Sequence, residues 1–108
     1  KLQTAIAYYK EAIRLAPNYT YAHSHLGNTL KEQGLVQEAI ECYQNLIEIQ
    51  PDYAIAHGNL ASCYFEIGEI DIAISAFKYA IQLEPHFPDA YNNLGNALRE
   101  KGELDEAI

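Results

Sequence analysis

Four histidines are the side chains of this chain best suited to binding a metal ion or transferring a proton. His23 and His25 are two positions apart, so on a helix they point in different directions, and His57 follows His23 by 34 residues. Histidine pairs that bind zinc on a helix are usually about four residues apart. The spacing therefore indicates packing roles in a core or interface, with His86 on the surface of a turn, and we expect no metal site.

Acidic side chains recur in a pattern that does not favour catalysis. Glu32, Glu66 and Glu100 follow one another at 34-residue intervals. General acid–base catalysis needs two carboxylates in different environments of one pocket, whereas a regularly repeated glutamate fits solvation and turn chemistry. The sequence also shows no Ser-His-Asp or Cys-His arrangement, phosphate-binding glycine loop or dinucleotide motif. We expect no enzymatic activity and no cofactor.

The 34-residue interval extends to most of the chain. A fixed period of this length is typical of stacked supersecondary units, each too small to bury its own apolar face. It predicts an all-α solenoid, an architecture that usually serves as a binding surface. The residues that keep the interval are Ala5, Ala39, Ala73 and Ala107, then Pro17, Pro51 and Pro85, and then Gly34, Gly68 and Gly102.

The unit at residues 20–53 shows how one repeat is built. Apolar residues at helical spacing predict a first helix over 21–33, which Gly34 ends because glycine tolerates a left-handed backbone. A second apolar stretch continues to Ile49, and Pro51 stops it. Two helices of about 13 residues are marginal alone in water, so packing between them must stabilise the unit.

The same pattern divides the chain into one continuous solenoid domain. Residues 1–19 form the second helix of a truncated unit, 20–53 and 54–87 are full units, and 88–108 hold a first helix and the start of a second. We therefore interpret the chain as a segment of a longer array.

Small residues mark where the helices of a unit approach each other. Gly27 and its counterpart Gly95 stand in the middle of a first helix, where glycine costs about 1 kcal/mol relative to alanine. That cost is explained if the second helix presses on this point and Tyr43 or Phe77 fills the space between neighbouring units. The other small residues of this pattern are Ala61 on a first helix, with Ala39, Ala73 and Ala107 on second helices.

Charge and composition narrow the class of partner. The net charge is −8, and the seven Lys and Arg do not cluster, which argues against nucleic-acid binding. No apolar run approaches the roughly 18 residues of a membrane span, and the first residues lack the features of a signal peptide. We expect an intracellular, cytoplasmic protein, with the nucleus as the alternative, and no membrane partner. Cys42 and Cys63, which are 21 residues apart, fit neither a disulfide framework nor a zinc pair and are expected to be small core hydrophobes.

These residues resemble the tetratricopeptide repeat over the whole chain. The unit at 54–87 carries the family pattern in full, and departures such as His23, His57 and Leu46 are mild. The matching residues are His57, Leu60-Ala61, Tyr64, Gly68, Ala73, Phe77, Ala80 and Pro85.

A narrower resemblance concerns the segments HGNLA at 57–61 and PHFPDAY at 85–91, with Asn93 and Leu94. They are similar to the repeats that precede the catalytic region of O-linked N-acetylglucosamine transferases. That resemblance implies a right-handed superhelix whose inner asparagines hold the backbone of extended protein substrates. None of the catalytic region of those enzymes is present in this sequence.

The family resemblance also implies a ligand groove lined by the first helix of each unit. Asn59, Asn93 and His25 take the position just before the Leu-Gly pair, and an asparagine amide can both donate to and accept from a peptide backbone. The next two turns contribute Asn28, Ser62 and Asn96, and then Lys31, Phe65 and Arg99. The alternative interpretation is a simply solvated helix face. Gly58 either admits a ligand closely or reflects packing by a neighbour.

The binding mode used for carboxylate tails does not fit this sequence. It requires lysines and arginines at positions that are Ser24, Gly58 and Asn92 in these units. The sequence thus favours a protein–protein interaction module that holds an extended peptide or partner protein.

Two other functions stay open. The chain could be a structural or self-assembly spacer that stacks head to tail through apolar ends, or the substrate-docking region of a glycosyltransferase encoded beyond Ile108. The apolar residues of the two ends are Ile6, Tyr9 and Ile13, and Leu94, Leu98 and Leu104.

Overall fold

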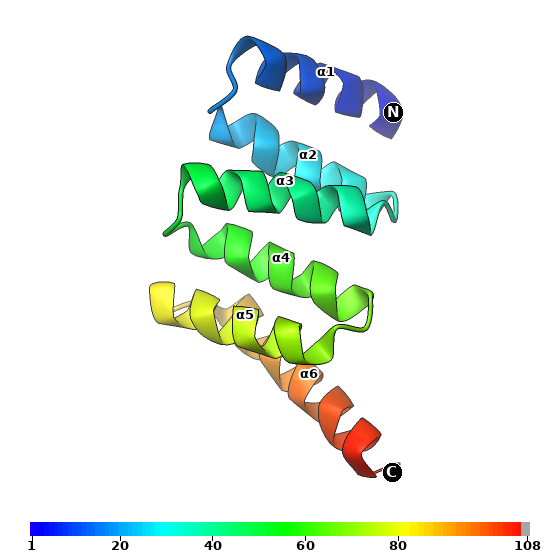
Figure 1. Cartoon of the computed structure of the whole chain (residues 1–108), viewed down its shortest axis with the longest axis vertical. Coiled ribbons are helices and arrows are strands. Elements are labelled where there is room, and N and C mark those ends of the chain that lie inside the picture. The colour runs from blue at the N-terminus through cyan, green and yellow to red at the C-terminus, as the bar shows by residue number, and fades with distance from the viewer. Residues whose placement is uncertain (107–108) are drawn as a thin grey trace. The chain divides into compact units, whose positions relative to one another are not determined.

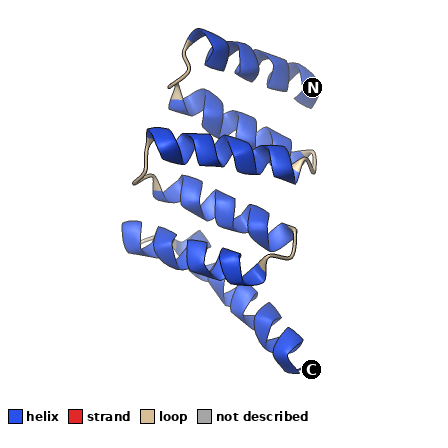
Figure 2. Cartoon of the chain, in the orientation of Figure 1, coloured by secondary structure: helices blue, strands red, loops and turns tan. Residues whose placement is uncertain are grey.

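The computed structural model describes residues 1–106 of the chain, with side chains described up to Glu103. This part of the chain is all-α and contains no strand, as the sequence predicted (Figures 1 and 2). Ala107 and Ile108, which complete the predicted repeat pattern, lie outside the described residues, as does the side chain of Leu104. The helices are α1 (Leu2–Leu15), α2 (Thr20–Glu32), α3 (Val36–Ile49), α4 (Ala54–Glu66), α5 (Ile70–Leu83) and α6 (Pro88–Glu106).

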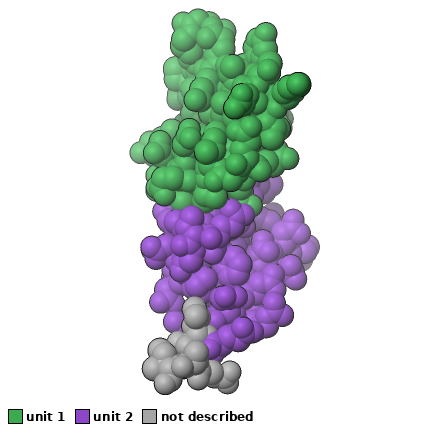
Figure 3. Space-filling view, turned by 90° about the vertical axis from the view of Figure 1, so that its right-hand side faces the viewer, with its two compact units in different colours: residues 1–51 green, residues 52–108 purple. Residues whose placement is uncertain are grey.

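The chain forms two compact units, Lys1–Pro51 and Asp52–Ile108 (Figure 3). In the first unit, α2 packs against both α1 and α3. In the second unit, α5 packs against both α4 and α6, and α4 also contacts α6. Each unit therefore packs three consecutive helices together, as expected for helices too short to be stable alone.

Glycines end the first helix of each helix pair. Gly34 has a φ of 82° and Gly68 a φ of 86°, in the left-handed region that favours glycine. The amide of Leu35 donates to the carbonyl of Leu30 at 2.9 Å, and the amide of Glu69 donates to that of Tyr64 at 2.9 Å. These bonds satisfy carbonyls at the helix ends. The predicted turns at Gly34 and Gly68 are confirmed.

The predicted turn at Gly102 is wrong for this chain. Helix α6 continues through Gly102 to Glu106, and Gly102 has no positive φ. At Gly34 and Gly68 the turn allows the following helix to pack back, α3 against α2 and α5 against α4. At Gly102 the helix continues instead, which keeps its main-chain hydrogen bonds.

The core of the first unit lies between α2 and α3. Tyr43 of α3 is fully buried and packs against Gly27 of α2, where an added Cβ would lie 2.8 Å from Tyr43 Cε1. The close approach predicted at Gly27 is therefore confirmed. Gly95 differs, because an added Cβ there would meet nothing within 4 Å. Other buried apolar residues of this core are Ala22, Leu26, Leu30, Ala39, Ile40 and Leu46.

The core of the second unit is built around Phe77 of α5. Its side chain is 1% exposed and packs with three buried alanines from three helices. Half-buried side chains, among them Tyr64, Phe65 and Leu94, surround this cluster. The alanines are Ala61 of α4, Ala73 of α5 and Ala90 of α6. Their small size lets the helices approach around one large ring, as the sequence pattern predicted.

Candidate functional site

The predicted ligand residues lie on the first helix of each helix pair, as the repeat pattern requires. Helix α4 carries Asn59, Ser62 and Phe65, and α6 carries Asn93, Asn96 and Arg99. Because α4 and α6 contact each other within the second unit, the structure brings these six residues onto two adjoining helices. His25, Asn28 and Lys31 lie on α2 of the first unit.

Asn59 and Asn93 are the central pair of the candidate site. Both side chains are half-buried, and within the described residues neither side-chain amide forms a hydrogen bond. A half-buried amide with unused donors and an unused acceptor can bind a polypeptide backbone, which offers the complementary groups.

Asn28 has a structural partner that the sequence did not reveal. Its Oδ1 accepts a hydrogen bond from the hydroxyl of Tyr43, so its amide helps to fix the ring that packs on Gly27. The next repeat has Ser62 in place of Asn28 and Phe77 in place of Tyr43. Where the aromatic ring has no hydroxyl, the asparagine that would bond to it is absent as well. This paired difference between the two repeats could have predicted the contact from the sequence.

His25 belongs to an aromatic cluster in the first unit. Its ring stacks on Tyr9 with a centroid distance of 5.7 Å and on Tyr21 at 6.3 Å. Tyr21 in turn contacts the edge of Tyr19 at 6.0 Å. The i, i+4 spacing of Tyr21 and His25 could have predicted one of these contacts. His25 therefore differs from Asn59 and Asn93 both in chemistry and in surroundings.

The other predicted ligand residues have varied environments. Phe65 is half-buried against the core of the second unit, so part of its ring stabilises the fold. Ser62 and Lys31 are also half-buried, whereas Asn96 and Arg99 are exposed. The predicted ligand residues His25 and Asn28 on α2 are exposed as well.

The structure decides between the two interpretations of Gly58. A Cβ on Gly58 would lie 3.0 Å from Cζ of Phe87, so this glycine allows the Phe87 ring to pack against α4. Packing by a neighbour therefore accounts for the glycine without a ligand.

The histidines of the first helices that the sequence assigned to packing have well-defined contacts. His23 is buried, and its Nε2 lies 2.8 Å from the carbonyl oxygen of Pro17. His57 is half-buried and meets Tyr79 edge to face at 4.8 Å. His86 is exposed in the turn before α6. Within residues 1–106, no three His, Cys, Asp or Glu side chains are grouped so as to hold a metal ion.

Both cysteines are buried free thiols, Cys42 on α3 and Cys63 on α4, as the sequence predicted. The pKa of the Cys42 thiol is raised to about 11, chiefly by burial and also by the nearby carboxylates of Glu41 and Glu38, while Lys10 lowers it.

We expect Cys42 to react with iodoacetamide at pH 8 on the order of 100-fold more slowly in the folded chain than in urea, because the thiolate is the reactive form. Between pH 9 and 11 the unfolded chain loses this thiol proton first, so the free energy of unfolding should fall as the pH rises through this range. Mass-spectrometric peptide mapping measures the reaction at Cys42 separately from Cys63. Equal rates in the folded and unfolded chain would contradict the prediction.

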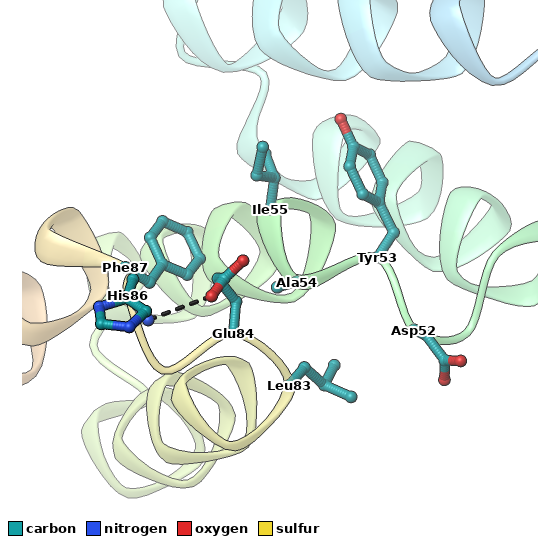
Figure 4. Close-up of a pocket in the computed structure, with 8 residues that line it drawn as sticks. All are labelled: Asp52, Tyr53, Ala54, Ile55, Leu83, Glu84, His86 and Phe87. Atoms are coloured by element: carbon teal, nitrogen blue, oxygen red, sulfur yellow. Dashed lines mark hydrogen bonds between the residues drawn. The ribbon is translucent and has the colours of Figure 1, made fainter.

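A pocket of about 420 Å³ lies in the second unit, beside the start of α4 and the end of α5. Figure 4 shows the Glu84 side chain projecting between Phe87 and Ala54, with Ile55 above and Leu83 below. The backbone amide of His86 donates to Glu84 Oε1 at 3.1 Å. The repeat pattern did not predict this pocket, because its walls come from two segments that are distant in the sequence, residues 52–55 and 83–87.

None of the helices within residues 1–106 is long and apolar enough to cross a membrane.

The helix pairs, their glycine turns and their alanine–aromatic packing define a helical repeat protein. The family model of the TPR repeat matches residues 1–34, 27–68 and 61–102. The chain therefore belongs to the tetratricopeptide (TPR) repeat family, as its sequence indicated. Comparison with curated proteins gave no match.

Several solved structures are similar to this chain. MamA is 34% identical with a TM-score of 0.87, and the match covers 98% of this chain and 62% of the MamA chain. YrrB, described as a TPR protein with an unusual peptide-binding site, is 25% identical with a TM-score of 0.81. That match covers 85% of this chain and 47% of the YrrB chain. The chain thus spans less than two thirds of the length of these relatives.

Proposed function

We propose that this chain is a protein–protein interaction module that holds an extended polypeptide along α4 and α6. The observation that carries the proposal is the burial and hydrogen bonding of the Asn59 and Asn93 side chains. They lie one repeat apart on two contacting helices, half-buried and with amides that bond to no described residue.

Asparagine suits this task for a physical reason. A peptide bond offers one N–H donor and one carbonyl acceptor, and the asparagine amide offers both complementary groups. Contacts of this kind fix the backbone of the ligand without reading its sequence. The partner is therefore a polypeptide in extended form, and side-chain selectivity must come from other groups.

The comparisons support a peptide ligand. YrrB is a TPR protein with a peptide-binding site, and its similarity to this chain makes a peptide or protein partner the best-supported class. We extend the proposal to a right-handed superhelical array like that of the O-linked N-acetylglucosamine transferases, on the basis of the segments 57–61 and 85–91. In that case the chain docks substrates inside the cell and has no catalytic activity of its own. Head-to-tail self-association is a separate alternative, and light scattering would detect it.

The proposal predicts that Asn59→Ala/Asn93→Ala weakens the binding of extended peptides by about 30-fold. Two hydrogen-bonding amides are removed, each worth about 1 kcal/mol, and about 1.4 kcal/mol corresponds to a tenfold change in affinity. The test is a peptide array followed by fluorescence titration of the peptides that bind, with circular dichroism to show that helices are intact.

A matched control is Asn18→Ala/Asn45→Ala, which makes the same chemical change at two exposed asparagines outside the candidate site. This control should bind like the wild-type chain. If Asn59→Ala/Asn93→Ala also binds like wild type, or if none of the three proteins binds any peptide, the proposal is wrong.

A further inference from the structure

The pocket beside Glu84 combines an apolar wall with one central carboxylate. Ile55, Leu83 and Phe87 supply apolar surface, and Ile55 is 49% exposed although it is a large aliphatic residue. Glu84 reaches into the pocket (Figure 4), where one of its carboxylate oxygens accepts a hydrogen bond from the backbone of His86. No lysine or arginine is among the residues that line the pocket. Its walls therefore suit an apolar side chain, and its charge suits a cation.

The charge of the second unit agrees with that of the pocket. Residues 52–108 contain ten Asp and Glu against three Lys and Arg, a formal net charge of −7, whereas residues 1–51 contain five against four. Nearly all of the net charge of −8 is thus carried by the unit that contains the pocket. A basic ligand gains from this field both in affinity and in association rate.

The dipoles of the neighbouring helices do not change the sign of the charge at the pocket. The end of α5 at Leu83 contributes about half a negative charge, and the start of α4 at Ala54 contributes about half a positive charge. These contributions oppose each other, while the carboxylates of Glu84 and Asp52 both line the pocket and no lysine or arginine does. The pocket is therefore net negative.

We infer that this pocket binds an apolar side chain of a partner polypeptide when a lysine or arginine follows it, with the cation placed against Glu84. The pocket volume of about 420 Å³ is within the range of sites that bind small ligands or side chains. The inference rests on the proposed function in one respect, that the ligand is a polypeptide. It adds selectivity for ligand side chains, which the asparagine pair lacks because its amides contact only the peptide backbone.

The repeat itself supplies the variant that tests the carboxylate. Gln50 stands 34 residues before Glu84, so Glu84→Gln introduces the residue that the chain already uses at the equivalent position. Ile55→Ser tests the apolar wall at an exposed position. Glu100→Gln is the matched control, because it removes one exposed carboxylate from the same unit. Glu100 lies on α6, well beyond Pro88, where that helix begins next to the pocket residue Phe87.

Three fluorescent peptides of equal length on a Ser/Gly background, containing Leu-Lys, Leu-Gln or Ser-Lys, serve as probes in anisotropy titrations at physiological salt. We expect the wild-type chain to bind the Leu-Lys peptide about fivefold more tightly than either of the others, as a partly exposed ion pair or a small apolar contact allows. Glu84→Gln should remove the preference for lysine and keep that for leucine. Ile55→Ser should do the reverse, and Glu100→Gln should keep both.

The inference is overturned if the three peptides bind the wild-type chain equally, or if Glu100→Gln weakens the Leu-Lys peptide as much as Glu84→Gln does. The second result would mean attraction by net charge alone. Asn59→Ala/Asn93→Ala separates the two proposals, because it should weaken all three peptides while leaving their order unchanged. If the wild-type chain shows no preference among the peptides but Asn59→Ala/Asn93→Ala still weakens their binding, only the pocket is rejected. If Asn59→Ala/Asn93→Ala binds like the wild-type chain, the proposed function is rejected.

Discussion

Phe77→Ala is expected to lower the free energy of unfolding of the second unit by about 3–5 kcal/mol, the cost typical of removing a fully buried aromatic ring. The ring is 1% exposed, and its buried neighbours are Ala61, Ala73 and Ala90. Alanines have no side-chain length with which to fill the space that the ring leaves. The cavity would therefore persist, except where the half-buried side chains around this cluster, among them Tyr64, Phe65 and Leu94, move into it.

Hydrogen exchange is the suitable measurement, because it reports each helix separately. Amides of α4, α5 and α6 should exchange much faster in Phe77→Ala than in the wild-type chain. Tyr91→Ala is a matched control, since it removes an aromatic ring that is 54% exposed on α6 and should cost less than about 1 kcal/mol. Equal effects of the two substitutions would show that Phe77 does not hold this core together.

Gly27→Val is expected to lower the free energy of unfolding of the first unit by about 2–3 kcal/mol through overpacking. A Cβ added at this position would lie 2.8 Å from Cε1 and 3.0 Å from Cζ of Tyr43. The Tyr43 ring is fully buried, and its hydroxyl bonds to Asn28, so it has little freedom to move away. Valine adds two further methyl groups against the same ring.

Gly95→Val is the control for helix propensity, because it makes the same substitution in the middle of α6, where a Cβ meets nothing within 4 Å. Valine is a slightly better helix former than glycine, so this variant should be unchanged or more stable by a few tenths of a kcal/mol. Thermal and urea unfolding followed by circular dichroism compare the two. The close contact between α2 and α3 would be disproved by a Gly27→Val chain as stable as Gly95→Val.

The repeat period accounts for what the sequence could predict. Residues 34 apart occupy equivalent places, so one physical argument about Gly34 and its turn applied equally to Gly68, and the pairing of a small residue with an aromatic ring held at Gly27 and Ala61. The equivalent turn is not found at Gly102, where α6 continues as a helix. Local sequence specifies that a glycine permits a turn, whereas tertiary packing decides whether the turn forms.

The candidate site was less predictable for a related reason. Helix periodicity places Asn59 and Asn93 at equivalent positions, but it does not show which amides are already bonded. Asn28 is equivalent to Asn96, yet Asn28 bonds to Tyr43 and Asn96 is exposed with no described partner. The pocket beside Glu84 was missed because its walls come from the start of one helix, the end of another and the turn after it. Such a site depends on distances between elements, which a repeat pattern does not contain.

Two-dimensional ¹H–¹⁵N NMR can show whether the amides of Asn59 and Asn93 bind the backbone of an extended peptide. Asparagine side-chain NH₂ groups give their own signals, so a titration with a peptide selected from the array reads these groups themselves. We expect the side-chain signals of Asn59 and Asn93 to move together as the peptide is added, while those of Asn18 and Asn45 stay in place. If a peptide binds and shifts backbone signals elsewhere while the signals of both Asn59 and Asn93 stay unmoved, these two amides do not hold the ligand.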